Sequence, residues 1–165
     1  MAQEFSFDAM SKVDTNLVAE CVQVAMKEVS NRFDFKGMVA NAEFNPKELA
    51  LTLTAQDEFK LKSLWDVVSM RLAKRGLPLK NFKLQRVEAA LGGTARQAVK
   101  VQQGIPSDKA KEIVAELKKS GLKVGSAIQG DQVRVSGRSK DELQAALALL
   151  KGKDFGLELQ FGNYR

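Results

Sequence analysis

The order of strand-like and helix-like patterns in this chain of 165 residues occurs twice. In the C-terminal copy, alternating apolar residues predict four strands, and apolar residues at helical spacing predict two helices. Residues Phe5 to Val87 show the same order. The C-terminal segments are, in chain order, strand Arg96–Gln103, helix Ser107–Ser120, strand Lys123–Ile128, strand Gln132–Ser136, helix Lys140–Leu150 and strand Leu157–Phe161.

This repeated order predicts an α+β fold of two tandem βαββαβ units. Each unit is expected to form a ferredoxin-like or ribonucleoprotein-like sandwich, in which two helices cover one face of an antiparallel four-stranded sheet. We assign residues 1–91 to the first unit and residues 92–165 to the second. The segment Glu88–Ala95, which contains Gly92 and Gly93, is the predicted linker. Because units of about 70–85 residues are small for independent folding, we expect them to pack on each other.

Capping residues mark the predicted starts of two helices. Asp14 is the expected N-cap of the first helix. Ser139 and Glu142 form the S-x-x-E capping box of the last one. Helical spacing also places Cys21 and Trp65 on apolar faces, so we expect a buried thiol and a core aromatic.

Histidine is absent from the sequence. Its absence removes the commonest general base, the usual partner of a serine or cysteine nucleophile, and the commonest transition-metal ligand. Neither G-x-G-x-x-G nor G-x-x-x-x-G-K-[ST] occurs, and no pattern indicates a close pair of catalytic acids. The sequence therefore predicts a protein that is not an enzyme and that has no metal site and no cofactor.

The sequence also indicates a cellular compartment. The N-terminus has no basic segment followed by an apolar run, and no stretch approaches the roughly 20 apolar residues that span a bilayer. Cys21 is the only cysteine, so an internal disulfide is excluded. We expect a cytoplasmic protein that does not enter membranes.

Positive charge is unevenly distributed along the chain, whose net charge is +6. Residues 1–95 hold 13 Lys and Arg against 12 Asp and Glu, whereas residues 96–165 hold 13 against 8. This excess in the second half favours an anionic partner there. Solubility alone is the alternative explanation.

Basic and polar side chains alternate along two predicted central strands of the second unit. On one strand these are Arg96, Lys100 and Gln102, and on the other Gln132, Arg134 and Ser136. Because this face has no aromatic residue, base stacking of the ribonucleoprotein type is disfavoured and binding led by phosphate contacts is favoured.

A phosphate site is predicted at the end of the strand that carries Arg134. Arg134 and Arg138 are four residues apart across a turn and are the first candidates for a pair of phosphate-binding guanidinium groups. Lys123 and Lys140 add charge. A solvated strand edge with charges that prevent aggregation is the alternative.

Two further segments combine aromatic and basic residues. Arg32 and Lys36 flank Phe33-Asp34-Phe35 at a helix end, where the phenylalanines either pack the two units together or face a ligand. Tyr164, the only tyrosine, either closes a nucleotide groove or belongs to a docked tail. Arg32, Lys36 and Tyr164 are therefore weaker candidates for nucleotide contacts.

Several strings resemble those of the YajQ family of small bacterial proteins. They are SNRFDFKG at residues 30–37, QQGI at 102–105, IQGDQVRVSGRSKDELQ at 128–144 and the ending LQFGNYR. The resemblance covers essentially the whole chain. It implies a tandem pair of ribonucleoprotein-like or ferredoxin-like domains, with exchange of N-terminal strands between them as one arrangement.

The resemblance also implies nucleotide or RNA binding without catalysis. It further implies that some relatives recognise cyclic di-GMP and that this recognition is coupled to a transcriptional regulator. With the residue-based reading, it leads us to expect a nucleotide-binding protein whose ligand is a nucleotide, cyclic di-GMP or RNA, bound through a basic sheet face and adjoining turns. The alternative is an adaptor whose basic face docks an acidic protein partner.

Overall fold

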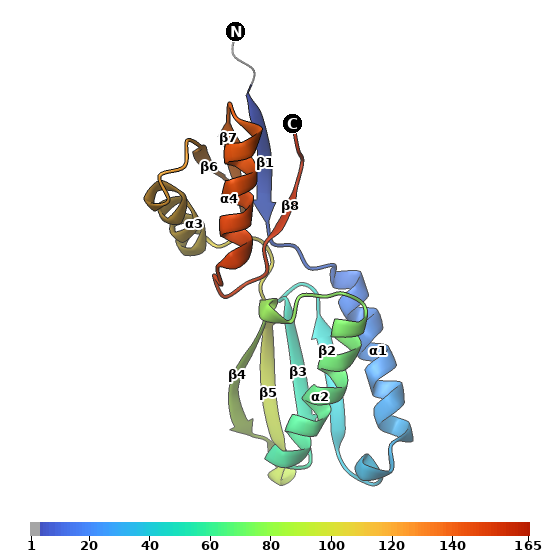
Figure 1. Cartoon of the computed structure of the whole chain (residues 1–165). Helices are drawn as coiled ribbons and strands as arrows, with labels where there is room; N and C mark the ends of the chain where they lie inside the picture. Colours follow the sequence, from blue (N-terminus) through green and yellow to red (C-terminus); the bar gives the residue numbers. More distant parts are fainter. Residues whose placement is uncertain (1–3) are drawn as a thin grey trace. The chain divides into compact units, whose positions relative to one another are not determined.

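The computed structural model describes residues 4–165, which fold into two compact units (Figure 1). One unit is the continuous segment Val13–Gln102. The other combines Met1–Lys12 with Gln103–Arg165. Each contains a four-stranded antiparallel sheet, so the predicted α+β class with two ferredoxin-like domains is confirmed.

The continuous unit Val13–Gln102 has the sheet order β2-β3-β5-β4. Helices α1 and α2 lie on one side of this sheet (Figure 1). Short 3-10 turns connect some of its elements at Phe33–Phe35, Leu79–Asn81 and Leu91–Gly93. Its main elements are α1 (Thr15–Asn31), β2 (Ala40–Asn45), β3 (Ala50–Ala55), α2 (Glu58–Lys74), β4 (Phe82–Ala89) and β5 (Ala95–Val101).

The discontinuous unit has the sheet order β6-β7-β1-β8. The predicted helices and the β6-β7 hairpin are present, with ends that differ from the sequence prediction by a few residues. Its elements are β1 (Phe5–Met10), α3 (Ser107–Lys119), β6 (Gly125–Gln129), β7 (Gln132–Gly137), α4 (Lys140–Gly152) and β8 (Gln160–Gly162).

Strands β1 and β5 are exchanged relative to a simple tandem arrangement. β1, dark blue in Figure 1, pairs with β7 and β8, although more than 120 residues of chain separate it from them. β5 pairs with β3 and β4. In each sheet the exchanged strand occupies the position that the first strand of a βαββαβ unit takes. The exchange implied by the family resemblance is therefore present.

Because of this exchange, the two units do not coincide with the expected segments 1–91 and 92–165. The chain passes between units after Lys12 and again after Gln102. Glu88–Ala95 is not the linker, since it forms the end and turn of the β4-β5 hairpin, in which the Ala90 amide donates to the Thr94 carbonyl at 2.8 Å. The residue pattern identifies each strand, but it does not specify which sheet the strand joins.

The exchange also changes the distribution of charge. The continuous unit holds 14 Lys and Arg against 10 Asp and Glu, and the discontinuous unit holds 12 against 10. The larger excess of positive charge, +4 against +2, therefore lies in the continuous unit. The expectation that the second unit carries this excess is wrong. The reason is that β5 brings Arg96 and Lys100 into this unit, while β1 takes Asp8 out of it.

Each unit has its own apolar core between sheet and helices. Leu53 and Val99 lie in the core of the continuous unit, and Phe7 and Ile113 lie in the other; all four side chains are at most 2% exposed. Cys21 is also 2% exposed, as predicted. Burial of such side chains contributes about 1.5–3 kcal/mol each for the larger aliphatic and aromatic residues.

The predicted helix caps and the predicted core aromatic are present. The Asp14 carboxylate accepts hydrogen bonds at the start of α1, and Ser139 Oγ accepts one from the Glu142 amide at 3.3 Å. Trp65 packs against the core but stays partly exposed.

Candidate functional site

A polar hollow lies on the face of the β2-β3-β5-β4 sheet opposite the helices. Strand register places Thr52 beside Ala98 and Glu88 beside Arg96 on this face. The hollow has a volume of 430 Å³, within the usual range of about 300–1,000 Å³ for small-molecule sites. It is lined by Thr52, Gln85, Arg86, Glu88, Arg96 and Ala98.

A β-bulge in β4 forms one wall of this hollow. The register between β4 and β5 shifts between Leu84 and Val87, which leaves Gln85 and Arg86 outside the regular ladder. The Gln97 side-chain amide donates to the Gln85 carbonyl at 2.8 Å and holds the bulge against β5. Because a bulge re-aims the side chains of the bulged strand, it accounts for the position of Arg86 beside the sheet face.

The cations of the hollow are accessible to a ligand. Arg96 Nη2 lies 3.3 Å from Glu88 Oε2, and both side chains are more than half exposed. Such an exposed pair contributes only about 0–1 kcal/mol, so an anionic ligand can replace the carboxylate. Within the described residues, Arg86 has no acidic partner.

This arrangement suits recognition of a phosphate and a flat polar ring. Two guanidinium groups can donate paired hydrogen bonds to phosphate oxygens, and their planes can stack on a base. Thr52 and Gln85 offer a hydroxyl and an amide, while the small side chain of Ala98 leaves the surface between them open. None of the residues that line the hollow is aromatic.

Of the residues predicted to contact nucleotide, Lys123 and Arg138 meet in a second groove. This groove, of 510 Å³, lies at the turn between β7 and α4 and also contains two acids, Glu4 and Glu142. The Glu142 carboxylate accepts a hydrogen bond from the Lys123 backbone amide at 3.3 Å. The two carboxylates offset the two cations, so an anion is less favoured here than in the sheet-face hollow.

Arg134 does not form the expected pair with Arg138 in that groove. It is not among the residues that line the groove, and its Nε donates to Asp8 Oδ1 at 3.0 Å. Asp8 lies directly opposite Arg134 on β1 and is 3% exposed. The hydrogen bond from Arg134 lowers the pKa of Asp8, which keeps the carboxylate charged and the guanidinium paired.

The prediction of a basic face formed by two neighbouring strands of one unit is also wrong. Arg96 and Lys100 lie on β5, in a different sheet from Arg134 on β7. In the sequence, these strands are central strands of one predicted unit. The strand exchange separates them, so the basic sheet face consists of β3, β5 and β4 residues instead.

Arg32 and Lys36 lie in the continuous unit, but neither residue lines the sheet-face hollow. Arg32 forms two hydrogen bonds to the Asp34 carboxylate, at 2.9 and 2.8 Å, and these lower the pKa of Asp34. Of the two neighbouring phenylalanines, Phe35 is buried in the core of its own unit and Phe33 is exposed.

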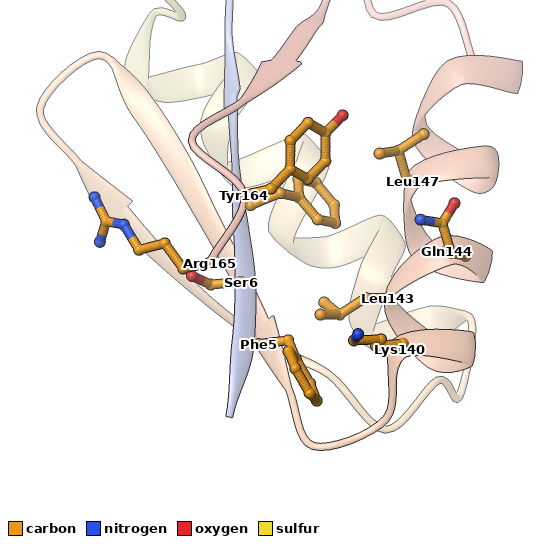
Figure 2. A pocket seen from close by; sticks show the side chains of 9 residues that line it. Phe5, Ser6, Lys140, Leu143, Gln144, Leu147, Tyr164 and Arg165 are labelled. Carbon is orange, nitrogen blue, oxygen red and sulfur yellow. The ribbon is translucent and has the colours of Figure 1, made fainter. Parts of the chain in front are cut away.

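Tyr164 belongs to a docked tail and also lines a small pocket. Arg165 and Ser6 exchange backbone hydrogen bonds at 3.0 and 3.2 Å, which fix the tail along β1. Figure 2 shows Tyr164 and Phe5 on one side of this pocket, and Leu143 and Leu147 of α4 on the other. Its volume is 160 Å³ and its walls are mostly apolar. The tail is therefore docked, and the closing of a nucleotide groove by Tyr164 stays a prediction.

Sequence reasoning missed Arg86, Thr52 and Gln85. The alternation of Arg96 and Lys100 on one strand was a usable signal for a basic face. The bulge that brings in Arg86 had no such signal, because it depends on how β4 pairs with β5. Among residues 4–165, no cluster of three or more potential ligands could hold a metal ion. No helix in that range has the length and apolar content needed to cross a membrane.

Comparison with known proteins identifies the family. The model of the family described as "Nucleotide-binding protein YajQ-like" matches residues 5–165. The chain belongs to the YajQ family. A "Nucleotide-binding protein" of Elusimicrobium minutum is 57% identical over 162 residues, which cover 98% of this chain and 99% of the relative.

Two other relatives cover the chain equally well. A "Nucleotide-binding protein" of Carboxydothermus hydrogenoformans is 48% identical over 165 residues, the full length of both chains. One of Solibacter usitatus is 46% identical over 160 residues, 97% of this chain and 96% of the relative. These YajQ relatives are named for nucleotide binding and not for a catalytic activity.

Proposed function

We propose that this protein binds a nucleotide in the sheet-face hollow, with phosphate on Arg86 and Arg96. The observation that carries the proposal is the position of two accessible guanidinium groups at one hollow of 430 Å³, beside the polar side chains of Thr52 and Gln85. The names of the relatives support nucleotide as the ligand class. The volume favours a mononucleotide or cyclic di-GMP over a folded RNA as the occupant of the hollow.

The proposed role is binding without catalysis. The hollow offers Arg, Thr, Gln and one exposed Glu, and this set contains neither a pair of carboxylates nor a nucleophile with a base beside it. A receptor that changes its contacts with a regulator on binding nucleotide is the use that we propose for such a site.

Calorimetric titration of matched variants tests the site. GTP, cyclic di-GMP and a short structured RNA are titrated into the wild-type protein and into R86A/R96A, each at low and moderate salt. We expect R86A/R96A to weaken nucleotide binding by at least about tenfold, since each charged hydrogen bond lost costs about 1.5–3 kcal/mol. Unchanged affinity in R86A/R96A would contradict the proposal.

The groove of Lys123 and Arg138 is the second candidate site, and K123A/R138A is the matched control. It removes the same number of positive charges from the other unit. Loss of binding in K123A/R138A with retention in R86A/R96A would move the site to this groove. Absence of binding to all three ligands by the wild-type protein would favour the adaptor function, with an acidic protein as partner.

A further inference from the structure

Strand β6 is an open edge of its sheet. It lies at one end of the order β6-β7-β1-β8, and among the described strands it pairs with β7 alone. Its sequence, Gly125-Ser126-Ala127-Ile128-Gln129, has no charged residue and no proline, and its ladder with β7 has no bulge. An open edge exposes unpaired backbone donors and acceptors, which folded proteins usually protect by such features. None of these protections is present in β6.

The other edge strands of the two sheets do have such protection. β4 is interrupted by its bulge and carries Lys83, Arg86 and Glu88. β2 carries Glu43, and β8 is only three residues long. Among the four edges of the described sheets, β6 is therefore the one that is most open to pairing with a further strand.

The backbone groups of Ser126 and Ile128 point away from β7. The two-residue turn after β6 joins Gln129 to Gln132, which are paired across the hairpin. Residues that flank such a turn form a hydrogen-bonded pair, and hydrogen-bonded and non-hydrogen-bonded pairs alternate along the two strands. Every second residue of β6, starting from Gln129, therefore bonds to β7. The amides and carbonyls of Ser126 and Ile128 face outward, and no hydrogen bond within residues 4–165 engages them.

The side chain of Ile128 is incompletely covered by its own unit. It is 45% exposed, although Val133, directly opposite on β7, is fully buried. Because paired residues point to the same face of a sheet, Ile128 lies on the core side of β6, at the rim of the core. A strand added beside β6 would cover this apolar side chain.

The sequence of β6 is complementary to a second copy of itself. Antiparallel pairing through the outward groups places Ser126 of each copy opposite Ile128 of the other, and Ala127 opposite Ala127. The same register brings Lys123 of each copy to the hairpin turn of the other, which carries Asp131; both residues are exposed. The two paired strands therefore contain no like charges that face each other, and opposite charges meet at their ends.

Charges on the neighbouring elements do not oppose this pairing. Arg134 lies opposite Ala127 on β7, but its guanidinium bonds to Asp8 on β1, on the side away from β6. Helix α3, which contacts β6, carries four Lys against three Asp and Glu. A second copy therefore meets little net charge at this edge.

We propose that two copies of this protein form a symmetric dimer through β6, in which their two four-stranded sheets join into one sheet of eight strands. The amides of Ser126 and Ile128 in each copy donate to the carbonyls of Ile128 and Ser126 in the other. Because one short strand of each copy takes part, the interface is smaller than the standard area of about 1,600 Å², and a weak dimer with a Kd of about 10–300 µM is expected. The interface shares no residue with the sheet-face hollow, so the dimer does not depend on the proposed nucleotide site.

Sedimentation equilibrium of the full-length protein, from about 5 µM to about 1 mM, tests this proposal. The wild-type protein should pass from monomer to dimer over this range. A127K and A127E each bring like charges together on the twofold axis, so each should weaken association by at least about tenfold. An equimolar mixture of A127K and A127E should associate at least as tightly as the wild type, because opposite charges then meet.

Two further kinds of variant separate edge pairing from other effects. N41K and N41E place the same charges on an exposed residue of the edge strand β2 in the other unit, and each should dimerise within about twofold of wild type. S126P removes an outward amide that β7 does not use, so it should weaken association while the thermal unfolding of the monomer stays cooperative.

A wild-type protein that stays monomeric up to about 1 mM would overturn the proposal. A dimer that both A127K and A127E leave intact would also overturn it and would assign association to another surface. If each variant is monomeric and their mixture stays monomeric as well, the antiparallel register centred on Ala127 is wrong and the proposed dimer is rejected.

Discussion

Asp8 and Arg134 are 126 residues apart in sequence and lie directly opposite each other on neighbouring strands, with Arg134 Nε 3.0 Å from Asp8 Oδ1. The second carboxylate oxygen of Asp8 accepts a hydrogen bond from Asn163 Nδ2 at 2.9 Å. The three residues come from β7, from β1 and from the tail after β8, so this polar contact joins three segments of the exchanged sheet. The free energy that this contact contributes to folding is therefore a measure of how firmly the exchanged strand β1 is held in its sheet.

Arg134→Ala is expected to destabilise the discontinuous unit. It leaves the buried Asp8 carboxylate with Asn163 as its remaining side-chain partner, and a charged group that loses such a partner costs about 2–3 kcal/mol. Urea unfolding at pH 7 measures this change in the free energy of unfolding. Arg138→Ala, on an exposed residue of the following turn, is the control and should change it by less than about 0.5 kcal/mol.

The stability contributed by Asp8 should depend on pH in the acid range. Because Arg134 lowers the pKa of the folded carboxyl below 3.8, this contribution is fully present well above pH 3.8 and is lost as the pH falls through the folded pKa. Urea unfolding between pH 7 and pH 2 should show that wild type and D8N differ in stability at pH 7 and converge at the lowest pH. A difference that stays constant down to pH 2 would show that the charge of Asp8 is not responsible.

The segment Val13–Gln102 should fold when it is expressed alone. It contains α1, α2 and all four strands of its sheet, including β5. A fragment of residues 1–91 lacks β5, and a fragment of residues 92–165 lacks β1, so each would lose a central strand and leave its neighbours unpaired. Amide dispersion in NMR spectra and cooperative thermal unfolding distinguish these cases. A well-folded 92–165 fragment would argue against the exchanged topology.

Cys21 should react slowly with thiol reagents in the folded protein. Its side chain is 2% exposed, and burial raises the pKa of the thiol, so little thiolate is present or accessible at pH 8. We expect modification by a chromogenic disulfide to be at least about 100-fold faster in 6 M urea. Equal rates in the two conditions would mean that the thiol is accessible in the native state.

The sequence predicted those features that depend on local patterns. Asp14 and Ser139 mark helix starts because their side chains bond to amides two or three residues away. The turn at Gln129-Gly130-Asp131 joins neighbouring strands, and Gly130 has the positive φ of 62° that such a turn requires. These interactions are contained within a few residues and can be read without the rest of the chain.

The sequence did not predict the pairings that involve distant segments. The alternating pattern of Arg96, Ala98 and Lys100 fits a central strand in either sheet, so it did not reveal that β5 joins β3. Arg134 was expected to contact phosphate together with Arg138, and its bond to Asp8 was not predicted because 126 residues separate the two in sequence. Arg86 was missed because a bulge, which depends on strand register, positions it.

The most direct test of the proposed nucleotide site is an NMR titration of the assigned backbone amides with GTP and with cyclic di-GMP. We predict that the largest shift changes fall on Thr52, Gln85, Arg86, Arg96 and Ala98, around the sheet-face hollow. Changes confined to the groove of Lys123 and Arg138, or to the pocket of Phe5 and Tyr164, would contradict the assignment of nucleotide binding to this sheet face.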